Sequence, residues 1–143
     1  MQITARNLDN LQLEIQAGDH LFIADETKND GGDDAGPSPY ALLLSSLAAC
    51  KIITVQLYAR RKQWPVASIT MRLSHKKVFA RDCEDCESDP NTKVDIIESE
   101  ISFEGDLNDE QKTRLAEIAD RCPVHRSLTS ETKIRTRLVD NEQ

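Results

Sequence analysis

Residues 38–62, SPYALLLSSLAACKIITVQLYARRK, decide the fold of this 143-residue chain. Ser38 and Pro39 are typical of a helix start, because a serine oxygen accepts from an unpaired N–H and proline lacks the N–H that the first turn cannot use. The basic residues 60–62 suit the negative end of a helix dipole. The sequence therefore predicts one long helix that ends at residue 61 or 62.

The predicted helix is apolar on nearly every side. Lys51 is the only charged residue between residues 42 and 58, and it is expected to point away from the face that carries Cys50. A helix that is apolar all round must be buried all round. Because a polar chain of this size has difficulty surrounding such a helix alone, we expect a second subunit to cover part of it.

The flanking segments predict an α+β fold with mostly antiparallel strands and with helices on one face. Apolar and polar residues alternate as in half-buried strands, and a tight turn centred on Lys76 is expected. Residues 25–38 are rich in Gly, Asp and Asn and predict a long loop, which is a mild sign of a covered site. The expected strands are residues 3–7, 11–17, 20–24, 67–75, 77–81, 94–103 and 132–139, and further helices are expected at 107–121 and from Cys122 onward.

The composition indicates one domain, covering residues 1–143, without a nucleic-acid surface. The 25 acidic residues outnumber the 18 basic ones and give a net charge of −7, whereas phosphate binding needs a basic face. No segment is expected to approach the apolar length of a membrane span, and the N-terminus lacks a charged start followed by an apolar run. We therefore expect a cytoplasmic protein that binds neither nucleic acid nor membrane.

Two of the four cysteines stand alone in the sequence. Cys50 lies within the apolar helix near Ser46 and Thr54, where it could be either a small core residue or a reactive thiol. Cys122 precedes a proline at an expected helix start, close to His125. Because a helix N-terminus favours a thiolate, Cys122 could be either a redox group or a buried helix cap.

The other two cysteines form the motif Cys83-Glu84-Asp85-Cys86, whose spacing occurs in zinc sites and in dithiol redox motifs. The neighbouring carboxylates should raise the pKa of both thiols and slow their attack on a peroxide. Zinc would need two further ligands, and the sequence has no second Cys-x-x-Cys and no closely spaced His pair. A solvated loop is favoured over a metal site or a local redox role, and no metal or cofactor is expected.

The residues around the two isolated cysteines resemble the OsmC/Ohr family of thiol-dependent hydroperoxide reductases. The similarity rests on residues 36–40 (GPSPY), 42–44 (LLL), 47–50 (LAAC) and 121–126 (RCPVHR), and the order of elements agrees along nearly the whole chain. Within the family, the chain is most similar to members with a Gly-Gly loop, here residues 31–32, and a helix end like residues 58–62. Members of that branch often carry an acidic Cys-x-x-Cys as well.

The resemblance implies one OsmC-like domain, with antiparallel sheets packed on the long buried helix, in an intertwined homodimer. It matches Cys50 to the peroxidatic cysteine, which becomes a sulfenic acid, and Cys122 to the resolving cysteine, which then forms a disulfide. In characterised members a glutamate holds an arginine against the thiolate, but Tyr40 occupies the glutamate position here. We expect Arg6 or Arg126 to supply the charge, with Tyr40 hydrogen-bonding in place of the glutamate.

Two classes of function follow from the resemblance. The first is an enzyme that reduces small apolar hydroperoxides through Cys50 and Cys122 and is regenerated by an external dithiol. The second is a non-catalytic OsmC-like dimer that binds or senses a small ligand. A metal-binding module built on Cys83 and Cys86 is a third hypothesis.

Overall fold

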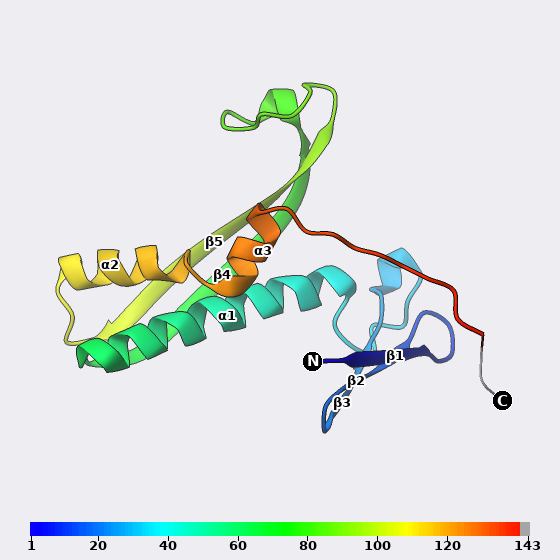
Figure 1. Cartoon of the computed structure of the whole chain (residues 1–143), viewed down its shortest axis with the longest axis horizontal. Helices are drawn as coiled ribbons and strands as arrows, with labels where there is room; N and C mark the ends of the chain where they lie inside the picture. Colours follow the sequence, from blue (N-terminus) through cyan, green and yellow to red (C-terminus); the bar gives the residue numbers. More distant parts are fainter. Residues whose placement is uncertain (141–143) are drawn as a thin grey trace. The chain divides into compact units, whose positions relative to one another are not determined.

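The computed structural model of the protein describes residues 1–140 and confirms the α+β class (Figure 1). One antiparallel sheet has the strand order β1-β2-β3, with Ile3 opposite Ala17 and Leu13 opposite Ala24, and β4 pairs with β5 in a second sheet. The strands are β1 (Ile3–Asn7), β2 (Leu13–Ala17), β3 (His20–Ala24), β4 (Val66–Phe79) and β5 (Lys93–Gly105). The helices are α1 (Pro39–Lys62), α2 (Asp109–Ala119) and α3 (Pro123–Thr129), with 3₁₀ turns η1 (Lys28–Asp30) and η2 (Ala80–Asp82).

Contacts within the chain define two compact units. The first contains residues 1–48 and 70–102, and so holds the three-stranded sheet, the N-terminal part of α1 and most of β4 and β5. The second contains residues 49–69 and the described part of 103–143, and so holds the C-terminal part of α1 together with α2 and α3. The expectation of a single domain over residues 1–143 stays a prediction.

Helix α1 begins and ends where the sequence predicts. Ser38 Oγ accepts a hydrogen bond from the backbone N–H of Ala41 at 3.4 Å and so caps the first turn. Helix α2 begins with a capping box, in which Asn108 accepts from the N–H of Gln111 and the Gln111 side chain accepts from the N–H of Asn108. Local sequence chemistry thus determines both helix starts.

Helix α1 is only partly buried within one chain, and its complete burial stays a prediction. Ile53 and Leu57 are 54% and 59% exposed, so the helix is not buried on all sides within one chain. It is also long and apolar enough to cross a membrane by length and composition, which corrects the expectation that no segment comes near that limit. A core helix meets the same criteria, and α1 carries a buried lysine at its centre. The buried residues of α1 recur at every fourth position and are Leu47, Lys51, Val55 and Ala59.

The turn expected at Lys76 is wrong, because residues 66–79 form the single strand β4. Half-buried and exposed side chains alternate from Ile69 to Lys76, and the strand continues through Lys76 to Phe79. The segment also has no glycine, proline or asparagine, the residues that favour a two-residue hairpin turn. Strand β4 instead pairs with β5, and residues 80–92 form the connection.

The strand expected at residues 132–139 is also wrong, since residues 131–140 have no regular secondary structure. Ile134 and Leu138 are 89% and 95% exposed despite the alternating sequence. A strand needs a neighbour to accept and donate its backbone hydrogen bonds. No described residue pairs with this segment, so its alternation has no partner within residues 1–140.

The long loop after β3 is organised by Asp25, which is only 2% exposed. Its carboxylate accepts hydrogen bonds from the backbone N–H groups of Glu26, Asp33 and Ala35 at 2.8, 3.0 and 3.1 Å. The bond from Ala35 has the largest effect on the pKa of Asp25 and lowers it, burial opposes that effect, and the other two bonds lower the pKa further. One carboxylate therefore fixes the path of this Gly- and Asp-rich segment.

We expect Asp25→Ala to release the loop. Because three N–H groups lose their acceptor, amide hydrogen exchange at Asp33 and Ala35 should become about tenfold faster at neutral pH. The folded-state pKa is lowered, so the protection is complete above the unfolded value of 3.8 and is lost as the pH falls through the lower, folded-state pKa. Asp19→Ala in an exposed turn is the matched control, and unchanged exchange in Asp25→Ala would refute the role.

Candidate functional site

The structure brings the two isolated cysteines of the sequence together. Cys50 lies on α1, and Cys122 is the N-cap of α3, where Pro123 occupies the first helical position. The backbone N–H of Val124 donates to Cys50 Sγ at 3.5 Å, and the N–H of His125 donates to Cys122 Sγ at 3.3 Å. Successive N–H groups of one helix start therefore point at the two sulfurs, both of which are free thiols.

Burial differs between the two thiols. Cys122 is fully buried, and Cys50 is partly accessible. Burial is the main reason that the pKa of Cys122 is raised, and the nearby Cys50 thiol raises it further. Two effects oppose this rise and lower the pKa of Cys122: the hydrogen bond from the His125 N–H and the positive charge of Lys51. The accessible Cys50 suits the attacking thiol, and the buried Cys122 suits the thiol that acts second.

Lys51 adds a charge beside Cys122 to the His125 and Arg126 that the sequence places near it. Its side chain is 3% exposed, and its Nζ lies 2.5 Å from Asp120 Oδ1 and 3.1 Å from His125 Nδ1. Its backbone position differs from that of Cys50, but the long side chain reaches the junction between α2 and α3. Asp120 and His125 thus belong to the site, and the isolated charge in an apolar helix was the sequence signal for Lys51.

The remaining predicted site residues lie at different places. Arg126 lies on α3, in the same unit as both cysteines, and is exposed. Arg6 lies on β1 in the other unit and forms an ion pair with Glu14 at 3.2 Å. Tyr40, in the first turn of α1, stacks on His75 with 4.2 Å between ring centroids. The roles assigned to these three residues stay predictions.

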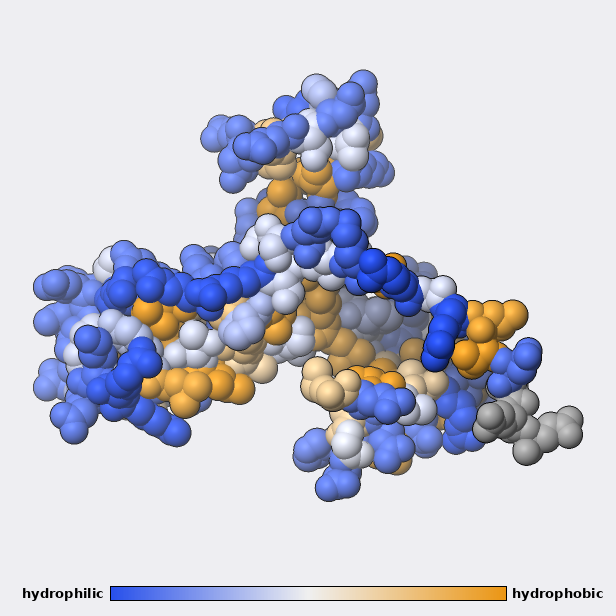
Figure 2. Space-filling model, in the orientation of Figure 1, coloured by the Kyte–Doolittle hydropathy of each residue, from blue (hydrophilic) through white to orange (hydrophobic). Residues whose placement is uncertain are grey.

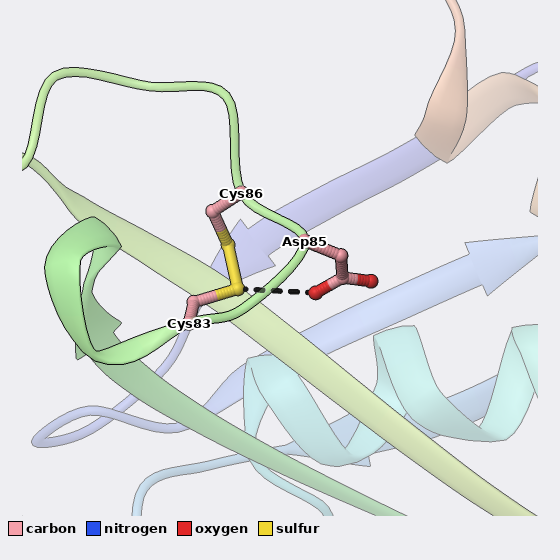
Figure 3. Close-up of a disulfide and its surroundings, with 3 residues drawn as sticks. All are labelled: Cys83, Asp85 and Cys86. Atoms are coloured by element: carbon pink, nitrogen blue, oxygen red, sulfur yellow. Dashed lines mark hydrogen bonds between the residues drawn. A yellow bond between two sulfur atoms is a disulfide. The ribbon is translucent and has the colours of Figure 1, made fainter.

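Cys83 and Cys86 form a disulfide in the connection between β4 and β5, with 5.5 Å between their Cα atoms (Figure 3). The Asp85 carboxylate lies 3.3 Å from Cys83 Sγ. Both cysteines are partly exposed, as a solvated loop predicts, but their sulfurs are bonded to each other. Cys83, Asp85 and Cys86 are the one group of three potential metal ligands found among the described residues.

We expect oxidised protein to contain two free thiols per chain, those of Cys50 and Cys122, and four after reduction. Thiol labelling in denaturant, with and without prior reduction, measures both numbers. Reduced protein should not hold stoichiometric zinc, because three clustered ligands leave a tetrahedral site incomplete. Four free thiols without reductant, or one zinc per chain that is lost in Cys83→Ser, would contradict this assignment.

These features define an α+β protein with a two-thiol site between a long helix and the start of a short one. The sequence model of the OsmC-like protein family matches residues 31–137, which is most of the chain. The chain therefore belongs to the OsmC-like protein family. No curated protein sequence is significantly similar to it.

Solved structures share this fold. An OsmC-like protein from Mycoplasma pneumoniae is 20% identical, with a TM-score of 0.70 over 90% of this chain and 86% of that one. The organic hydroperoxide resistance protein OsmC from Legionella pneumophila is 16% identical, with a TM-score of 0.64 over 89% and 87%. An OsmC-like hydroperoxide resistance protein from Jannaschia sp. is 18% identical, with a TM-score of 0.54 over 97% and 91%. At these identities the comparison establishes the fold.

Proposed function

We propose that this OsmC-like protein is a redox protein of the stress response that reduces organic hydroperoxides through Cys50 and Cys122. The observation that carries the proposal is the pair of free thiols whose sulfurs accept N–H groups from consecutive residues, Val124 and His125. Family membership and the hydroperoxide resistance proteins of the same fold support this chemistry.

The proposed reaction has two steps. The Cys50 thiolate attacks the terminal peroxide oxygen, the O–O bond breaks, and the released alkoxide takes a proton to become an alcohol, which leaves a sulfenic acid on Cys50. The Cys122 thiol then displaces the sulfenic oxygen as water, so that a Cys50–Cys122 disulfide forms. An external dithiol reduces this disulfide and restores both thiols.

The surface around α1 favours apolar substrates. Hydrophobic side chains gather over α1 in Figure 2. Ile53 and Leu57, on the helix that carries Cys50, are exposed. Contact between such a surface and an alkyl or aryl hydroperoxide is favourable because it removes apolar area from water. Hydrogen peroxide has no apolar group and would bind this surface weakly. Organic hydroperoxides are therefore the proposed substrate class.

The same exposed surface supports an obligate homodimer. A second chain can bury the exposed apolar side chains of α1. It can also pair with the backbone groups of the alternating segment 131–140, which has no strand partner among the described residues. We expect sedimentation to show a dimer that yields no compact, folded monomer on dilution to micromolar concentration. A folded monomer at that concentration would refute the dimer.

Anaerobic thiol titration tests the proposed function directly. In metal-free buffer without reductant, cumene hydroperoxide should remove two thiols per chain rapidly, and hydrogen peroxide should act more slowly. Addition of a dithiol should restore both thiols and sustain turnover. Thiols that persist in excess organic peroxide would contradict the peroxidase and leave a binding or sensing OsmC-like dimer.

A further inference from the structure

We propose that Lys51, held by Asp120 and His125, is the positioning residue that favours the thiolate in the Cys50–Cys122 pair. This inference rests on the proposed function, because it assigns the cation that a thiol-based site needs. It also has a consequence that needs no peroxide, namely the reactivity of the two thiols with an alkylating reagent.

The first support is the placement of an ammonium group in the interior. Lys51 is 3% exposed and is, with Asp25, one of two buried charged residues among residues 1–140. A buried ammonium is costly unless it is paired and hydrogen-bonded. Asp120 Oδ1 at 2.5 Å and His125 Nδ1 at 3.1 Å supply those partners.

The second support is the connection from Lys51 to both sulfurs. An ammonium can only donate, so His125 Nδ1 is the acceptor in its contact with Lys51. The backbone N–H of the same His125 donates to Cys122 Sγ, and that of the preceding Val124 donates to Cys50 Sγ. The lysine charge is therefore fixed to the helix start that contacts both thiols.

The third support is electrostatic. The charged or titratable groups at this helix start are Asp120, Arg121, His125, Arg126 and the two thiols, and both arginines are exposed. Burial raises the pKa of Cys122, whereas the charge of Lys51 lowers it. A cation beside a buried thiol makes the thiolate less unfavourable than it would be with burial alone.

Fold stability alone does not account for this arrangement. The partner Asp120 is 66% exposed, and ion pairs with solvent-exposed groups contribute little to stability. A methionine at position 51 would bury a similar volume without a charge to desolvate. A buried lysine at position 51 therefore lowers the stability of the fold relative to an apolar residue. A role of its charge at the thiols explains why a lysine is present.

The test measures the rate of alkylation of Cys50 and Cys122 against pH, peptide by peptide, with iodoacetamide and mass spectrometry. Lys51→Met should move the alkylation midpoint of Cys122 to higher pH and slow the alkylation of Cys122 at neutral pH about tenfold. Cys50 should slow in the same direction. Lys51→Arg should retain most of the reactivity, and Lys62→Met, at the exposed end of the same helix, is the matched control.

Asp120→Asn separates an electrostatic role from a structural one. If Lys51 acts by its charge, removal of the neutralising carboxylate should leave alkylation at neutral pH as fast or make it faster, in contrast to Lys51→Met. If the ion pair only holds the local structure, both variants should slow alkylation equally, and that result would overturn the proposal. Unchanged alkylation in Lys51→Met with an intact thermal transition would also overturn it. Loss of peroxidase activity with these alkylation shifts intact would refute the proposed function alone.

Discussion

Cys50→Ser should abolish the consumption of cumene hydroperoxide, with a loss of at least a thousandfold in rate. A serine hydroxyl remains protonated at neutral pH and cannot form the sulfenic acid, so the first step has no nucleophile. The substitution replaces sulfur with oxygen at a partly accessible position, so helix α1 should remain folded. Peroxide consumption in the presence of a dithiol is the measurement.

Ser46→Ala is the matched control for this prediction. Ser46 is exposed one turn before Cys50, and its hydroxyl donates only to the Leu43 carbonyl oxygen of its own helix. This variant should retain the rate of the unmodified protein. Activity that survives in Cys50→Ser would assign the peroxide chemistry to another cysteine.

Cys122→Ser should stop turnover after about one equivalent of peroxide per chain. Cys50 can still attack, but no second thiol is in place to form the disulfide, so the sulfenic acid accumulates. Serine is a preferred N-cap residue, so α3 should still begin at Pro123 and the N–H of His125 should keep an acceptor. The loss should therefore be chemical and not a failure to fold.

Trapping with dimedone distinguishes the outcomes for Cys122→Ser. The expected product is one dimedone adduct on the Cys50 peptide, which the unmodified protein forms only in trace amounts. Sustained turnover at the unmodified rate, without an adduct, would show that an external thiol resolves the sulfenic acid directly. That result would remove Cys122 from the proposed mechanism.

Local sequence chemistry predicted the elements that carry the site. Ser38 and Pro39 determine the start of α1, and Cys122 and Pro123 determine the start of α3. These predictions succeeded because capping needs only neighbours in the chain. The contact between the two cysteines was expected from the family resemblance and not from their spacing.

The errors came from interactions between distant residues. The sequence assigned Lys51 no partner, because Asp120 and His125, which its side chain contacts, are far from it along the chain. Residues 132–139 alternate like a strand, but pairing depends on a neighbour that is not present among residues 1–140. The alternation of apolar and polar residues predicted a strand at β4, but it could not by itself determine the length of that strand.

Tyr40, which stands where characterised family members have a glutamate, has defined contacts in the structure. Instead of a carboxylate, the first turn of α1 presents a ring that stacks on His75, and His75 Nε2 lies 2.7 Å from Asp95 Oδ1. Tyr40 is therefore part of a local cluster with β4 and β5 in the first unit. A cation for the thiols does not have to come through this position, because Lys51 is already placed beside the α3 start.

The most direct test of the account is to map disulfides before and after treatment with one equivalent of cumene hydroperoxide, under anaerobic and metal-free conditions. We expect a Cys50–Cys122 cross-linked peptide to appear in proportion to the peroxide consumed, while the Cys83–Cys86 disulfide stays unchanged. If Cys50 and Cys122 remain free thiols while the peroxide persists, the two cysteines are not a peroxide-reducing pair.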